Sequence, residues 1–274
     1  MLLGYFGVFL AFSLISLFST LLLFIFKEAK TPARSSKDST NLTLGQFLKA
    51  RRPLLALLCN GMCDLLLFSL EPTLALKLSA DYNFSAYLIG GYFFLFFVGG
   101  AITMTAMIFI PEHWDKRKLI CPSMVLMAFF SFLVGPSSLF FLPNSYILIG
   151  IGMFLTGATR GICISLCPTD AIIGGIKAFP EHESKVSDLV SSIYSFLLGI
   201  AMLFYTILGS AIVQAVGFRW AFDIVSIVLV ISSTIYTVST IVDWRAERRE
   251  IQSEQESRGE ESYPLNTQND PNYL

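Results

Sequence analysis

The fold class is decided by residues 53–76, which read PLLALLCNGMCDLLLFSLEPTLAL. The only charged side chains in this stretch are Asp64 and Glu71. A helix needs about 20 predominantly apolar residues to cross the hydrocarbon core of a bilayer. Lipid offers no hydrogen-bond partners to free backbone groups, so a spanning segment of this kind must be helical. The stretch therefore predicts a membrane-spanning α-helix that carries two acidic residues.

Six further windows of the chain have the same apolar character. They are residues 2–26, 87–110, 119–141, 146–168, 189–216 and 220–241. The whole sequence is 54% apolar and only 14% charged, far from the balance of a soluble domain. The first window holds no charge and lacks the basic start of a secretory signal, which favours a spanning helix. We therefore predict an all-α membrane protein with seven transmembrane helices, embedded in a lipid bilayer.

The basic residues predict how the chain is oriented in the membrane. Of the 19 lysines and arginines, all but Lys77, Arg160 and Arg219 lie in the loops after the first, third and fifth windows or after the last. Cytoplasmic loops are enriched in Lys and Arg, so this side is predicted to be cytoplasmic. The N-terminus is then lumenal or extracellular and the C-terminus cytoplasmic. Vesicular, lysosomal and plasma membranes all remain open.

The polar segments divide the chain into four parts. Residues 1–26 form the first transmembrane helix, and residues 27–52 form a cytoplasmic linker rich in Ser, Thr and Lys. Residues 53–241 form a unit of six helices. Residues 242–274 have almost no apolar content, which cannot repay the entropy of ordering, so we predict a disordered cytoplasmic tail.

Ionisable residues inside the spans are the candidate site, because each costs on the order of 3 kcal/mol to insert into a bilayer. Asp64 and Glu71 lie seven residues apart, which places them on one helix face about 10 Å apart. Arg160 lies between small residues in the fifth window, where another helix can approach closely, and either acid is a candidate partner. Asp223 lies four residues after Arg219 and is interpreted as its partner near a membrane boundary. Asp64, Glu71 and Arg160 are therefore the predicted substrate-binding residues.

Signals for enzymatic, metal or nucleic-acid chemistry are weak. Cys59 and Cys63, like Cys163 and Cys167, are pairs at helical spacing, yet neither pair has the nearby His or further Cys that completes a tetrahedral site. No catalytic triad or glycine-rich phosphate loop is evident. A net charge of −1 gives no reason to expect a nucleic-acid partner. We predict neither a metal nor a cofactor, and no enzymatic activity.

Short motifs in the six-helix unit carry a family resemblance. Glu71-Pro72 lies in its first helix, the basic loop 111–118 reads PEHWDKRK, and residues 217–222 read GFRWAF. This order resembles the C-terminal half of a major facilitator superfamily transporter. Residues 68–76, FSLEPTLAL, and 190–196, VSSIYSF, look similar more narrowly to the vesicular amine and polyamine transporter family.

The resemblance implies both an architecture and an activity. Residues 1–26 would match the sixth helix of the full fold and residues 53–241 the last six. In that family the glutamate matching Glu71 contributes to recognition of a cationic substrate, and proton exchange drives transport. Monoamine members carry further acids where this sequence has Cys163 and Leu198, so the implied solute class is widened to an amine or a polyamine.

Three functions follow from these observations. The first is a proton-coupled secondary active transporter of a small cationic organic solute, working with an N-terminal half or a partner subunit that lies outside this chain. The second is a non-transporting accessory membrane subunit of a larger complex, derived from a transporter half. The third is a seven-helix receptor, which shares the helix count but would place its long charged loop elsewhere.

Overall fold

The computed structural model describes residues 5–25, 42–111 and 114–261 of the chain. It divides into two units, residues 1–41 and residues 42–274. The first unit contains α1 (Tyr5–Ile25), so the described part of the first predicted window is helical. Helix α1 is 21 residues long and contains no charged residue, and its crossing of a membrane stays a prediction.

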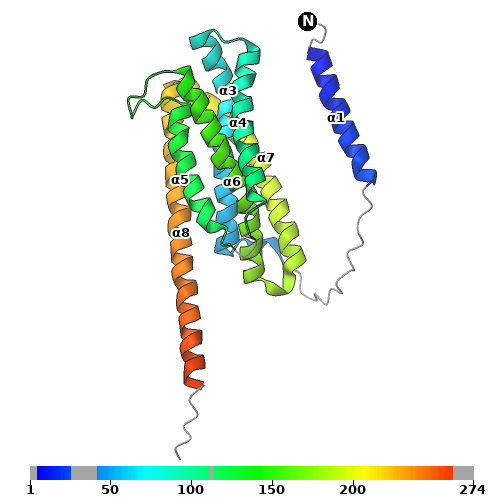
Figure 1. The fold of residues 1–274 in the computed structure, drawn as a ribbon, viewed down its shortest axis with the longest axis vertical. Coiled ribbons are helices and arrows are strands. Elements are labelled where there is room, and N and C mark those ends of the chain that lie inside the picture. The colour runs from blue at the N-terminus through cyan, green and yellow to red at the C-terminus, as the bar shows by residue number, and fades with distance from the viewer. Residues whose placement is uncertain (1–4, 26–41, 112–113, 262–274) are drawn as a thin grey trace, which may run out of the picture. The chain divides into compact units, whose positions relative to one another are not determined.

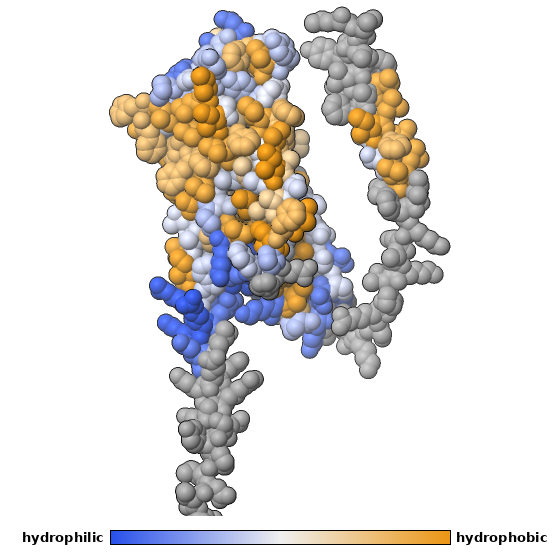
Figure 2. Space-filling view, in the orientation of Figure 1, coloured by the Kyte–Doolittle hydropathy of each residue, from blue (hydrophilic) through white to orange (hydrophobic). Residues whose placement is uncertain are grey.

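The second unit is a bundle of helices (Figure 1). Its elements are α2 (Leu44–Phe47), α3 (Arg51–Tyr82), α4 (Ala86–Met107), α5 (Arg117–Val134), α6 (Tyr146–Ala178), the 3-10 helix η1 (Pro180–His182), α7 (Glu183–Val216) and α8 (Phe218–Glu261). Six helices, α3 to α8, are long and apolar enough to cross a membrane, as expected of an integral multi-pass membrane protein. Apolar side chains cover much of the visible face, and hydrophilic ones gather toward the ends of the bundle (Figure 2).

Helices α3 and α6 form the centre of the bundle. Helix α6 packs against α3, α4 and α5, while α3 also packs against α7 and α8. In α3, 67% of the most apolar stretch is buried, against 11% in α4 and 11% in the span that contains α7. A polar residue on α3 or α6 therefore lies among other helices, whereas most of α4 and α7 faces outward.

The helices begin and end differently from the predicted windows. Helix α5 ends at Val134 because Gly135 and Pro136 follow it, and the expected continuation to residue 141 is a loop. Helix α6 passes through Pro168 and continues to Ala178. One proline removes a single backbone hydrogen bond, which a packed membrane helix tolerates. This extension brings Asp170 into the helix.

The C-terminal segment differs from the prediction of a disordered tail. Helix α8 runs without a break as far as Glu261 and extends beyond the other helices of the bundle (Figure 1). Two features account for this helix. Its Glu, Gln and Arg residues have high helix propensity, and the side chains of Trp244 and Glu247 are hydrogen-bonded to Asp115 and Arg117. Residues 262–274 lie outside the described part of the chain.

The predicted linker 27–52 also contains folded structure at its end. The bundle unit begins at Leu42, and the short helix α2 belongs to it. Phe47 of α2 is fully buried and its ring centroid lies 6.5 Å from that of Phe179. Burial of this aromatic side chain ties the end of the linker to the bundle. Residues 26–41 lie outside the described part of the chain.

Candidate functional site

A buried ion pair joins α3 to α6 near the middle of both helices. Arg160 donates to Oδ1 of Asp64 from Nη2 at 2.5 Å and from Nε at 3.2 Å. The Asp64 side chain is 1% exposed and that of Arg160 is 13% exposed. The guanidinium of Arg160 also lies 6.0 Å from the ring centroid of Phe96 on α4. Of the two predicted partners for Arg160, the structure selects Asp64.

Close packing of α4 against α6 brings Phe96 to Arg160. A Cβ atom at Gly157 would lie 1.9 Å from the carbonyl oxygen of Phe96, and one at Gly161 would lie 2.5 Å from that of Gly100. Neither backbone oxygen can move aside easily, so both positions require glycine. The prediction that small neighbours of Arg160 let another helix approach is therefore confirmed, and that helix is α4.

Polar atoms around the ion pair lack hydrogen-bond partners. Oδ2 of Asp64 is buried and has no partner among the described residues. The same holds for Oδ1 of Asn60, one turn away on α3, and for Oγ1 of Thr156, one turn away on α6. Buried polar groups are nearly always hydrogen-bonded in folded proteins. Oδ2 of Asp64 can therefore accept a proton or a polar ligand within the α3–α6 interface.

Glu71 does not join the ion pair. It follows Asp64 by two turns of α3, is exposed, and precedes Pro72 inside the same helix. Within the described residues it has no hydrogen bond or ion pair. The helix face that Asp64 shares with Glu71 is thus covered by α6 at Asp64 and open at Glu71.

Four thiols gather in the same interface. Sγ of Cys59 on α3 lies 3.8 Å from Sγ of Cys167 on α6, and Cys63 and Cys163 lie one turn further along α3 and one turn earlier on α6. All four side chains are buried. The spacing of the cysteines in the sequence groups them as two separate pairs and does not predict that the pairs meet. Among the described residues, however, no group of three or more His, Cys, Asp or Glu side chains is arranged to hold a metal ion.

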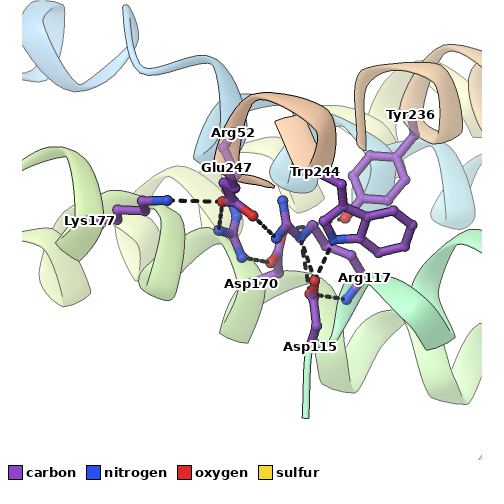
Figure 3. Close-up of polar contacts among 8 residues, drawn as sticks. All are labelled: Arg52, Asp115, Arg117, Asp170, Lys177, Tyr236, Trp244 and Glu247. Carbon is purple, nitrogen blue, oxygen red and sulfur yellow. Dashed lines mark hydrogen bonds and ion pairs between the residues drawn. The ribbon is translucent and has the colours of Figure 1, made fainter. Parts of the chain in front are cut away.

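A second charged cluster lies at one end of the bundle, near the beginning of α3 and α5 (Figure 3). Asp170 of α6 is 1% exposed, and its Oδ1 lies 2.6 Å from Nη2 of Arg52 on α3. The hydroxyl group of Tyr236 on α8 donates to Oδ2 of Asp170 at 3.3 Å. Both oxygens of this acid are therefore satisfied. Asp170 was missed because the predicted span ended at Pro168.

Glu247 of α8 lies at the centre of this cluster. Its oxygens lie 2.9 Å from Nη2 of Arg117, 3.0 Å from Nζ of Lys177 and 3.6 Å from Nη1 of Arg52 (Figure 3). These cations come from α5, α6 and α3, so one carboxylate links four helices. It was missed because the segment from residue 242 onward was predicted to be disordered. We call Arg52, Asp115, Arg117, Asp170, Lys177, Tyr236, Trp244 and Glu247 the end network.

Asp115 adds a further contact between α5 and α8 to the end network. Arg117 Nε donates to its two oxygens at 3.0 and 3.2 Å, and Trp244 Nε1 donates to Oδ2 at 2.5 Å. Partial burial opposes the charge of this carboxylate, but the hydrogen bonds from Arg117 and Trp244 outweigh it, so the pKa of Asp115 is lower than its usual value. Asp115 is therefore held as a carboxylate.

Asp223 and Arg219 have separate partners at the opposite end. Oδ2 of Asp223 accepts from the backbone N–H of Ser138 at 3.1 Å. Arg219 donates to the carbonyl oxygens of Pro136 and Leu142 at 2.7 and 2.8 Å. Both residues hold the loop between α5 and α6, and the predicted ion pair between them is absent from the described contacts. Their role here is structural.

Comparison of the sequence with models of known protein families and with curated proteins finds no match. The family resemblance therefore stays a hypothesis carried by the motifs quoted above.

Proposed function

We propose that this chain is one half of a secondary active transporter of the major facilitator type, which exchanges protons for a small cationic organic solute, an amine or a polyamine. The observation that carries this proposal is the exposed carboxylate of Glu71 inside a membrane-spanning helix. A second half, on the same polypeptide or on a partner, would complete the solute cavity.

Insertion of Glu71 into a membrane costs free energy unless its side chain faces water or protein. A charged side chain in lipid costs on the order of 3 kcal/mol or more. Ionisable residues in transmembrane segments therefore usually face a water-filled cavity, and they often mark ion or substrate pathways. Helices α4 and α7, which are little buried in the bundle, supply apolar surface for a second half. A carboxylate in such a cavity attracts a cation.

The Asp64–Arg160 pair is the proposed proton-coupling element. The charge of Asp64 is balanced by Arg160, and its Oδ2 is an unused acceptor. Protonation at Oδ2 removes the negative charge that holds Arg160 and weakens the link between α3 and α6. A cation bound at Glu71, about two helical turns away, would favour one protonation state of Asp64 through its charge.

A second candidate is an accessory membrane subunit that does not transport. The observation that favours it is the neutralisation of Asp64 by Arg160, which needs no ligand. On this proposal, Glu71 is covered by another protein chain instead of a solute cavity.

Proton release from membrane vesicles distinguishes the two. Vesicles from cells that express this chain together with its second half, identified as the membrane partner that co-purifies with it, are loaded with acid and a pH-sensitive dye, and spermidine or tyramine is added outside. We expect the interior pH to rise, and Glu71→Gln to reduce the initial rate by about tenfold or more, because a contact to a charged group is worth about 1.5–3 kcal/mol.

Glu181→Gln is the matched control, since Glu181 is exposed in η1 outside the ion pair and the end network. It should leave the rate unchanged. Equal rates with and without this chain, in cells that also supply the membrane partner recovered with it on purification, would reject transport in favour of the accessory subunit.

A further inference from the structure

A groove lies between α8 and the turn that joins α2 to α3. Its volume is about 620 Å³, within the range of about 300–1,000 Å³ that small-molecule sites occupy. Its mouth is lined by Lys49 and Arg51, and its length by Leu54, Ile235 and Val238. One end is therefore cationic and the rest apolar.

The apolar wall of the groove is not covered by the bundle. Ile235 is 57% exposed and Val238 is 54% exposed, although both lie in the part of α8 that is apolar enough to cross a membrane. Inside a bilayer such side chains contact lipid chains. The groove thus offers a hollow in the lipid-facing surface where an acyl chain can lie.

The cations at the mouth have no acidic partner among the described residues. Arg51 donates from Nη2 to Oγ of Ser239 at 2.9 Å, a buried hydroxyl that holds the guanidinium in place. Arginine has five N–H donors, so the others stay available. The neighbouring Arg52 is paired with Asp170 and Glu247, whereas Arg51 and Lys49 have no described ion pair; Asp243 lines the adjoining hollow beside Arg51.

We propose that this groove binds one anionic phospholipid, with its phosphate between Lys49 and Arg51 and an acyl chain along Leu54, Ile235 and Val238. Charge complementarity supports this occupant, since basic pockets between membrane helices bind anionic head groups. Residues 27–41 contain four basic and two acidic residues, so they are a poor source of the anion. The acidic residues between positions 250 and 261 lie on α8, which extends beyond the end of the bundle (Figure 1).

Lipid retention by the full chain tests this site. The protein is placed in nanodiscs that contain equal amounts of phosphatidylglycerol and phosphatidylcholine, and native mass spectrometry measures which lipid stays bound. Each cation near a membrane surface contributes about fivefold to binding of anionic lipid. We therefore expect preferential retention of phosphatidylglycerol, and about a 30-fold loss of that preference in the Lys49→Ala/Arg51→Gln variant.

Lys118→Ala/Arg248→Gln is the matched control, because it removes one lysine and one arginine that are exposed outside the groove. It should keep the preference. Equal retention of the two lipids by the unmodified protein, or equal losses in the two double variants, overturns the proposal.

A second variant keeps both cations and fills the groove. Val238→Trp adds volume to an exposed position of α8, so it should preserve the fold while displacing the acyl chain. We expect retention of phosphatidylglycerol to fall at least fivefold. Unchanged retention would mean that charge at the membrane surface alone holds the lipid, and it would overturn the groove as the site.

Discussion

Two ion pairs connect the same helices, α3 and α6, but their surroundings differ. In the middle of the bundle, Asp64 depends on Arg160 alone and one of its oxygens has no partner. At the end, Asp170 has Arg52 on one oxygen and Tyr236 on the other, and Glu247 provides Arg52 with a second acid. Redundant contacts allow the loss of one partner, whereas a solitary pair does not. The middle pair is therefore suited to switching and the end network to holding helices together.

The largest expected effect is at the middle pair. Arg160→Met leaves the carboxylate of Asp64 buried without a partner, which should lower the free energy of unfolding by about 3–5 kcal/mol. Titration of the purified protein with SDS in mixed micelles measures this change. Adding Asp64→Leu to this variant removes the unpaired charge and should recover most of the lost free energy of unfolding. A destabilisation no larger than that of Arg248→Met, at an exposed site, would show that the pair does not stabilise the fold.

A smaller effect is expected at the end network. Arg52→Met removes one hydrogen bond from Asp170 but leaves that of Tyr236, so the same titration should show a loss of about 1.5–3 kcal/mol. Lys177→Met is its control, because Lys177 is 58% exposed and pairs with the same Glu247. An exposed ion pair contributes less than about 1 kcal/mol. If Arg52→Met cost as much as Arg160→Met, the contrast between the two regions would be lost.

The smallest effect is a pH dependence at Asp115. Because the pKa of this carboxyl group is lower in the folded chain than its usual value of 3.8, it stabilises the fold above pH 3.8. That contribution is lost as the pH falls through the lower folded value. Comparison of the unmodified protein with Asp115→Asn should show a stability difference near neutral pH that shrinks in acid. A constant difference across the range would contradict the role of Arg117 and Trp244 in holding the carboxylate.

Much of the bundle could be predicted from local composition. Six of the predicted windows became long apolar helices because apolar runs in lipid leave the backbone few other structures. The residues at which the helices begin and end were less predictable. Asp170 and Glu247 look like loop and tail residues in sequence, and only their distant partners show why the helices continue through them.

The candidate site was predictable in part. Charges inside apolar windows singled out Asp64, Glu71 and Arg160, and Arg160 was expected to pair with one of the two acids. The clustering of four cysteines could not be predicted. The spacing of each pair shows only that its two residues share one face of their own helix. That these faces of α3 and α6 pack against each other is decided by the tertiary structure.

By itself, the sequence determined that this chain has several helices long and apolar enough to span a membrane, where most of them lie and which buried charges need explanation. These follow from hydrophobicity and from the high cost of charge in lipid, which act on each segment alone. Only the tertiary structure decided that Asp64 pairs with Arg160 while Glu71 stays exposed, and that the C-terminal helix is tied to the end network. Those choices depend on which helices pack together, and residues distant in sequence determine that packing.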